Sequence, residues 1–172
     1  MSSLLCITLA LVSGFDIGGR VGGNFPAAGL ETNHGSSALF GAAVGYTLGR
    51  SRFELGYAYS GLPGRQGSPY RLDLSDLVAT YGFEYLRRPS WGFDASVGAG
   101  YSLVRRVLNA ASESGGTPSA HLGLGFVQHQ GSSRVSLGLD NCFFIQSAAA
   151  GSTRRVAIVY LFSIRAGVAY AF

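Results

Sequence analysis

The stretch YLFSIRAGVAYAF, residues 160–172, alternates strictly between two kinds of side chain. One parity is apolar throughout and carries aromatic rings at both of its ends. The other parity is mostly small and holds a single charge, that of Arg165. Because successive side chains of a β-strand point to opposite faces, the stretch predicts a strand with one apolar face and one small, polar face.

Seven further alternating runs precede this one, and breaks rich in glycine, proline and serine separate them. They are residues 15–25, 38–48, 52–60, 72–85, 91–103, 120–129 and 134–144. The connections alternate between hairpin-sized turns and long loops, with three short turns on one side and four long loops on the other. This pattern predicts an all-β fold, an eight-stranded antiparallel up-and-down barrel.

The composition agrees with such a barrel and excludes several other classes of protein. The chain has 172 residues, of which 13% are charged and 26 are glycine. No run of about 18 apolar residues encodes a membrane-spanning helix, so the apolar residues are spread over the alternating strands. The net charge of +4 comes from arginines that are scattered along the chain, which does not indicate nucleic-acid binding.

The size of the two faces decides which of them looks outward. In residues 52–60 the larger face carries Phe53, Leu55, Tyr57 and Tyr59, and the opposite face is small apart from Glu54. An eight-stranded barrel has an interior just wide enough for side chains, so we expect the large apolar face outside, where only lipid suits it. The alternative fold, a soluble ligand-holding barrel, requires the opposite parity. Aromatic residues near both ends of the runs predict two interfacial girdles.

These features resemble the small eight-stranded outer-membrane β-barrels of the OmpA and OmpX class. The openings FDIGGRVGGNFP and FELGYAYS, residues 15–26 and 53–60, are similar to that family. The resemblance implies a monomer without a cofactor in the outer membrane of a Gram-negative bacterium, in contact with lipid and lipopolysaccharide. It also implies that the barrel assembly machinery reads an alternating C-terminal signal. The residues that match this signal are Tyr160, Phe162, Ile164, Val168, Tyr170 and Phe172.

The N-terminal segment has the features of an export signal. LLCITLALV, residues 4–12, is uniformly apolar and has the length of a signal-peptide core, although no positive residue precedes it. We therefore predict a signal peptide in residues 1–14 and a barrel domain in residues 15–172. The two cysteines, Cys6 and Cys142, form neither a zinc motif nor a disulfide framework, and removal of the first leaves the second unpaired.

The small face of the strands carries the charges that we expect inside the barrel. They are Asp16, Arg20, Glu54, Asp76, Glu84, Asp94, Arg134, Asp140 and Arg165. Charges in a narrow interior must pair, and we expect ion pairs that hold the strands in register. A proton or ion path is the alternative. His121 and His129 share this face, but eight residues of strand separate them by about 26 Å, so the two cannot share a metal ion and no metal site is predicted.

The function predicted from these features is a structural or surface-interaction role in the outer membrane, without enzymatic activity. A narrow channel or small-solute transporter is one alternative. A lipid A-modifying enzyme is another, with Ser102, Ser119, His121 and Asp140 as its candidate residues. Arginines near the long loops suit the phosphates of lipopolysaccharide. They are Arg65, Arg71, Arg105, Arg106, Arg154 and Arg155.

Overall fold

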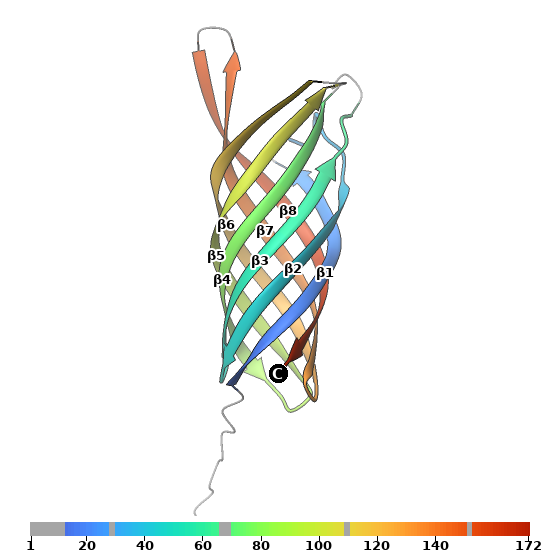
Figure 1. The fold of residues 1–172 in the computed structure, drawn as a ribbon, viewed down its shortest axis with the longest axis vertical. Coiled ribbons are helices and arrows are strands. Elements are labelled where there is room, and N and C mark those ends of the chain that lie inside the picture. The colour runs from blue at the N-terminus through green and yellow to red at the C-terminus, as the bar shows by residue number, and fades with distance from the viewer. Residues whose placement is uncertain (1–12, 28–29, 66–69, 109–110, 151–152) are drawn as a thin grey trace, which may run out of the picture.

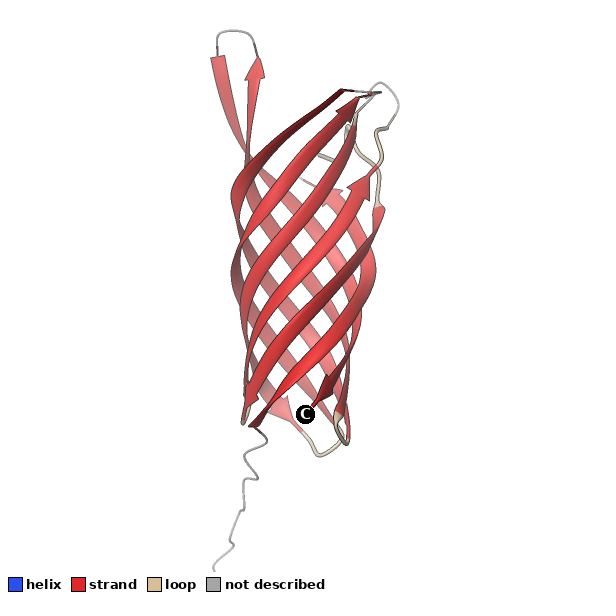
Figure 2. Cartoon of the chain, viewed as in Figure 1, coloured by secondary structure: helices blue, strands red, loops and turns tan. Residues whose placement is uncertain are grey.

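The computed structural model describes residues 13–27, 30–65, 70–108, 111–150 and 153–172, and leaves out the side chains of residues 13, 111, 146–150 and 153–157. Almost all of the described chain is strand (Figure 2). The strands are β1 (Ser13–Ala27), β2 (Ser37–Leu48), β3 (Ser51–Leu62), β4 (Arg71–Arg87), β5 (Trp91–Leu108), β6 (Ala111–Gln130), β7 (Ser133–Ala150) and β8 (Thr153–Ala171). The apolar core of the predicted signal peptide lies outside the described residues.

Each strand pairs antiparallel with the next one along the chain, and β8 returns to pair with β1 (Figure 1). The backbone amide of Phe172 donates to the carbonyl of Phe15 at 3.0 Å, which continues this last pairing to the end of β8. The tight turns after β2 and β6 use Gly49 and Gly131, whose φ angles of 61° and 59° suit glycine best. The prediction of a closed eight-stranded antiparallel barrel is confirmed.

The strands are longer at the long-loop end than the alternation predicted. Residues 104–119 and 145–159 were expected to be mainly loops, but most of them continue the paired strands β5–β6 and β7–β8. The β7–β8 hairpin rises well beyond the rest of the barrel (Figure 1). Strict apolar alternation marks the part of a strand that faces lipid. A hairpin outside that zone keeps its backbone pairing without the alternation. The strands predicted from the alternation are therefore shorter than the observed strands.

The large apolar side chains point outward, as predicted. Leu55, Leu77 and Val97 are each at least half exposed, although they lie well inside their strands. On the opposite face the neighbouring Glu54 is buried. This parity is the reverse of what a soluble ligand-holding barrel requires, so that alternative is wrong.

The described residues contain no helix that is long and apolar enough to cross a bilayer.

Aromatic rings gather at both ends of the outer surface and contact one another across neighbouring strands. At the short-turn end the ring centroids of several pairs lie close together, among them Phe15–Tyr46 at 4.9 Å, Phe53–Tyr81 at 5.3 Å and Phe93–Phe126 at 5.5 Å. At the long-loop end two pairs do so, Phe143–Tyr160 at 5.1 Å and Phe25–Phe162 at 6.2 Å. These rings form the two predicted girdles, and tilted or edge-on contacts of this kind stabilise neighbouring strands.

A buried apolar cluster, here called the outer plug, fills the long-loop end of the interior. Leu62, Leu72 and Phe144 point inward and are almost completely buried. The cluster also contains Leu30, Leu74, Val104, Cys142, Val159 and Leu161. Only small residues and charges were predicted inside. The outer plug was missed although Leu72, Leu74, Phe144 and Leu161 share the parity of the inward charges within the predicted runs.

Candidate functional site in the barrel interior

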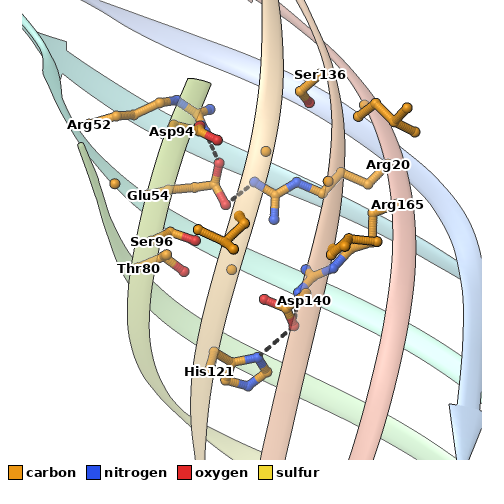
Figure 3. Close-up of a pocket in the computed structure, with 18 of the residues that line it drawn as sticks. Arg20, Arg52, Glu54, Thr80, Asp94, Ser96, His121, Ser136, Asp140 and Arg165 are labelled. Atoms are coloured by element: carbon orange, nitrogen blue, oxygen red, sulfur yellow. Dashed lines mark hydrogen bonds and ion pairs between the residues drawn. The ribbon is translucent and has the colours of Figure 1, made fainter. Parts of the chain in front are cut away.

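The first group of interior charges links β1 to β3. The guanidinium of Arg52 donates to the carboxylate of Asp16 through Nε at 3.2 Å and Nη2 at 2.5 Å, and through Nη1 to Glu54. The other oxygen of Glu54 contacts the guanidinium of Arg20. Figure 3 shows Arg20 and Glu54 pointing toward each other across the interior. We call these four residues the Glu54 cluster.

The second group of charges lies toward the short turns. Arg134 of β7 donates to Asp94 of β5 at 2.7 Å. Glu84 of β4 lies 3.5 Å from Arg87 and 3.2 Å from the Nε2 atom of His129 on β6. The pairs Arg134–Asp94 and His129–Glu84 join strands that are not hydrogen-bonded neighbours in the barrel wall. In the Glu54 cluster, Arg20–Glu54 and Arg52–Asp16 do the same. These ion pairs therefore cross the barrel interior and do not simply link neighbouring residues along its wall.

The third group surrounds the imidazole of His121 on β6. Its Nε2 atom lies 2.8 Å from Asp76 Oδ2, and its Nδ1 atom lies 3.2 Å from Asp140 Oδ2. Asp140 also pairs with the guanidinium of Arg165, and Figure 3 shows this contact beside His121. The Sγ atom of Cys142 is 3.6 Å from Nε2.

Two hydroxyl groups complete this third group. Ser102 and Ser119 each donate to Oδ1 of Asp76, at 2.8 and 3.0 Å. Every polar atom of the Asp76 carboxylate is thus engaged by a neighbour, which compensates its removal from water. We call the group the His121 cluster, and its members are Asp76, Ser102, Ser119, His121, Asp140, Cys142 and Arg165.

Several cavities remain between the described interior side chains, and one of about 20 Å³ borders Arg20 and Arg134. The largest, of about 270 Å³, lies at the short-turn end and is lined by residues that include Glu84 and Arg134. A polar cavity of about 110 Å³ lies beside the Glu54 cluster and reaches Asp140. Another, of about 40 Å³, lies between the His121 cluster and the outer plug. The largest of these spaces therefore lies toward the short turns.

All of the interior charges predicted from the sequence face the inside of the barrel, and each lies within ion-pair distance of an oppositely charged or protonatable partner. Arg52, the residue at the centre of the Glu54 cluster, was not among the predicted interior charges. Arg52 was the first residue of a predicted strand, and its parity with Glu54 was the signal that could have placed it inside. His121 and His129 bind different partners, as their spacing required.

The residues of the predicted assembly signal lie on the outer face of β8. Ile164, Val168 and Tyr170 are exposed there, and Phe172 is the most exposed of the large apolar residues in the described chain. The hydroxyl of Tyr160 donates to Asn141 of β7. Recognition of these residues by an assembly machinery stays a prediction.

The arginines at the long-loop end make local contacts on the surface. Arg65 donates to the carbonyl of Glu31 at 2.9 Å, and Arg71 donates to Asp73 at 2.6 Å. Arg105 donates to a serine hydroxyl of the paired strand β6. Arg106 is partly buried. The side chains of Arg154 and Arg155 lie outside the described residues.

The candidate residues of the enzyme alternative do come together, since Ser102, Ser119, His121 and Asp140 all belong to the His121 cluster. Ser102, Ser119 and His121 are buried and face the interior. The acyl chains of lipid A lie on the other side of the barrel wall. In this arrangement the hydroxyls donate to Asp76 and the imidazole is held between two carboxylates, which suits charge compensation or ion binding better than attack on a lipid.

No protein-family model and no curated protein sequence matches the chain. Solved structures do match its fold. Neisserial surface protein A superposes with a TM-score of 0.67 at 17% identity, over 93% of this chain and 98% of that one. The fold is that of a small outer-membrane β-barrel.

Two further structures agree with this result. The attachment invasion locus protein Ail of Yersinia pestis has a TM-score of 0.55 at 13% identity, over 93% of this chain and 97% of its own. The N-terminal β-barrel domain of Pseudomonas aeruginosa OprF has a TM-score of 0.54 at 15% identity, over 92% and 99%. The predicted location in the outer membrane of a Gram-negative bacterium is confirmed by this fold together with the apolar outer surface.

Proposed function

We propose that the protein has a structural or surface-interaction role in the outer membrane, and that its own side chains keep the interior closed to solutes. The observation that carries this proposal is the set of ion pairs that cross the interior. Arg20 of β1 reaches Glu54 of β3, and Arg134 of β7 reaches Asp94 of β5. Such pairs occupy the space that a continuous water column needs.

The outer plug supports the same conclusion at the other end of the barrel. A charged solute that passes the Glu54 cluster meets Leu62, Leu72 and Phe144, which offer no hydrogen bonds in return for lost hydration. A narrow channel or a small-solute transporter needs polar lining along its whole length. The arrangement therefore favours a closed barrel whose work is done at its surface.

Conductance across a planar bilayer tests this proposal. The refolded protein is expected to give no steady current, and a variant with Arg20→Ala, Glu54→Ala and Phe144→Ala is the matched control in which the crossing pair and the outer plug are both weakened. Folding of each protein is checked by its heat-modifiable migration in a detergent gel. A steady, ion-selective current from the unaltered protein would overturn the proposal.

The surface partner that fits the chemistry of the long-loop end is lipopolysaccharide. Arg71 is exposed and Arg105 projects from the same end of the barrel, and a guanidinium binds phosphate through two parallel hydrogen bonds. A structure of Ail holds sucrose octasulfate, a heparin analogue, which shows that a barrel of this fold can bind a polyanion.

Unfolding in vesicles with and without lipopolysaccharide tests this partner. Lipopolysaccharide is expected to raise the urea midpoint of the unaltered protein and to lose that effect in the double variant Arg71→Gln and Arg105→Gln. The matched control removes two exposed arginines at the opposite end, Arg50→Gln and Arg88→Gln. An equal effect of lipopolysaccharide on both double variants contradicts the proposed contact.

A further inference from the structure

We propose that Asp76, His121 and Cys142 form a binding site for a divalent transition-metal ion, with Zn²⁺ as the best-matched ion. The three residues come from β4, β6 and β7, so no spacing along the sequence reveals them as a set. Each contributes one ligand atom, and these atoms all lie within 4.8 Å of one another.

One separation between ligand atoms matches a tetrahedral site, and a second comes within about 0.6 Å of it. Zinc binds cysteine sulfur at about 2.3 Å and histidine nitrogen at 2.0–2.1 Å, so a tetrahedral site places the two atoms about 3.6 Å apart. The observed distance between Cys142 Sγ and His121 Nε2 is 3.6 Å. The carboxylate of Asp76 lies 2.8 Å from Nε2 and has to retreat by only about 0.6 Å to bind the same ion.

The residues around this set are arranged as supports for metal ligands. Asp140 accepts from the Nδ1 atom of His121 at 3.2 Å and so orients the ring. At 2.8 Å from Asp76 Oδ2, the Nε2 atom donates a proton to that carboxylate in the metal-free protein, and a bound ion takes the place of this proton. Arg165 in turn holds Asp140. A carboxylate behind a ligating histidine fixes the orientation and tautomer of the ring in metal sites. Ser102 and Ser119 hold the other oxygen of Asp76 in the same way.

The charges of the cluster leave room for a cation. Of the described carboxylates that face the interior, Asp76 is the one with no arginine within ion-pair distance. Asp76 and Asp140 together face a single guanidinium, that of Arg165. A bound dication replaces the proton on Nε2 of His121 and the thiol proton of Cys142, so the cluster keeps its net charge and Cys142 is stabilised as a thiolate.

The donor set also selects the class of ion. Thiolate and imidazole ligands favour zinc and its neighbours in the first transition series over Mg²⁺ and Ca²⁺, which prefer sites built of oxygen atoms. The cavity of about 40 Å³ beside Asp76, His121 and Cys142 gives space for a water molecule as the fourth ligand.

Co²⁺ is the probe that tests this site, because a cobalt–thiolate bond absorbs in the near ultraviolet and aqueous cobalt does not. The full chain carries Cys6→Ser, so that Cys142 is its single thiol. It is refolded in detergent with Co²⁺ in stepwise excess. The expected result is a thiolate-to-cobalt absorption band that saturates at one ion per chain, disappears on addition of Zn²⁺ and survives an excess of Mg²⁺.

Variants assign the ligands. Cys142→Ser should abolish the absorption band, and Asp140→Asn should weaken cobalt binding about 10- to 100-fold while the ligands stay in place. His129→Ala is the matched control, because it removes the other inward histidine of β6 and should leave binding unchanged. Folded protein that shows no saturable band overturns the proposal, and so does a band that persists in Cys142→Ser. If a variant fails to migrate as a folded barrel, the titration of the parent protein decides the question by itself.

Discussion

Replacement of Glu54 by alanine should destabilise the barrel more than any exposed charge deletion. The carboxylate of Glu54 is 3% exposed and contacts both Arg20 and Arg52. Without it, Arg52 retains Asp16, but Arg20 has no carboxylate within ion-pair distance among the described residues. Removal of one partner from a buried ion pair typically costs 3–5 kcal/mol, because the remaining charge stays buried without compensation. The side chain of Arg20 is 24% exposed, so we expect the lower end, about 3 kcal/mol in the free energy of unfolding.

Urea unfolding in lipid vesicles measures this loss. Trp91 is the single tryptophan and lies in the short-turn girdle, where its fluorescence reports departure from lipid. The urea midpoint should fall while the denaturant slope stays unchanged, which separates lost stability from a change in the unfolded state. The matched control is Glu113→Ala, which removes an exposed glutamate of β6 and should change the free energy by no more than about 0.5 kcal/mol.

A double replacement distinguishes two causes of the loss in stability, the uncompensated charge of Arg20 and the space left by the Glu54 side chain. Arg20→Met combined with Glu54→Leu removes both charges and fills their space, and apolar replacements of buried ion pairs are often neutral or stabilising. We therefore expect the double variant to be more stable than Glu54→Ala alone. A loss below about 1 kcal/mol for Glu54→Ala, the size typical of exposed pairs, would refute the view that this pair is buried and holds β1 to β3.

Three further predictions follow from other parts of the barrel. Leu55→Arg places a charge on the lipid-facing surface and should cost about 2–4 kcal/mol in vesicles; an unchanged urea midpoint contradicts the assigned outward face. Phe144→Ala leaves a void in the outer plug and should cost about 3–5 kcal/mol by the same measurement, whereas a loss under 1 kcal/mol means that the outer plug collapses around the void. Burial, and then the nearby charge of Arg106, lower the pKa of His34 in the long-loop region from its ordinary value of 6.5. A lowered pKa means that the folded state favours the neutral ring. The contact between the His34 segment and the loop after β3, in which the Gly35 amide donates to the carbonyl of Pro63, should therefore be strongest above about pH 6.5 and weaken as the pH falls. Hydrogen exchange at the Gly35 amide, corrected for its intrinsic pH dependence, should accelerate below about pH 6.5. Equal protection of this amide above and below that pH contradicts the prediction.

Most of the fold was predictable because two physical requirements shape the same residues. Lipid demands apolar side chains outside and a closed set of backbone hydrogen bonds, and a strand can meet the first demand only by strict alternation. The run at residues 160–172 illustrates this, because its outward side chains are all apolar and its inward side chains are mostly small. The extensions of β5 to β8 were not predictable in the same way, because outside the lipid no requirement forces one face of a hairpin to be apolar.

The pairing of interior charges was predictable only in part. Parity places Asp76, His121 and Cys142 on the inner face of three different strands. Whether they meet depends on the stagger between strands, which fixes the height of each residue along the barrel axis. A shift of two residues between neighbouring strands preserves every parity and separates every one of these contacts. The sequence therefore predicted that the interior charges form ion pairs, but only the register between strands determines which residues pair.

Conduction and stability compete for the same side chains in this barrel. For an ion to pass the middle of the interior, crossing pairs such as Arg20–Glu54 and Arg134–Asp94 must separate together. Each separation leaves both charges of a pair in the interior without compensation, so the open form is disfavoured. The side chains of the outer plug would have to move as well. The ion pairs and the outer plug lie inside the barrel, whereas the projecting β7–β8 hairpin stands beyond it (Figure 1). Substitutions that give the protein a new binding partner therefore cost the least stability in the exposed loops and the projecting hairpin. Substitutions in the interior are constrained, because the ion pairs and the outer plug stabilise the barrel.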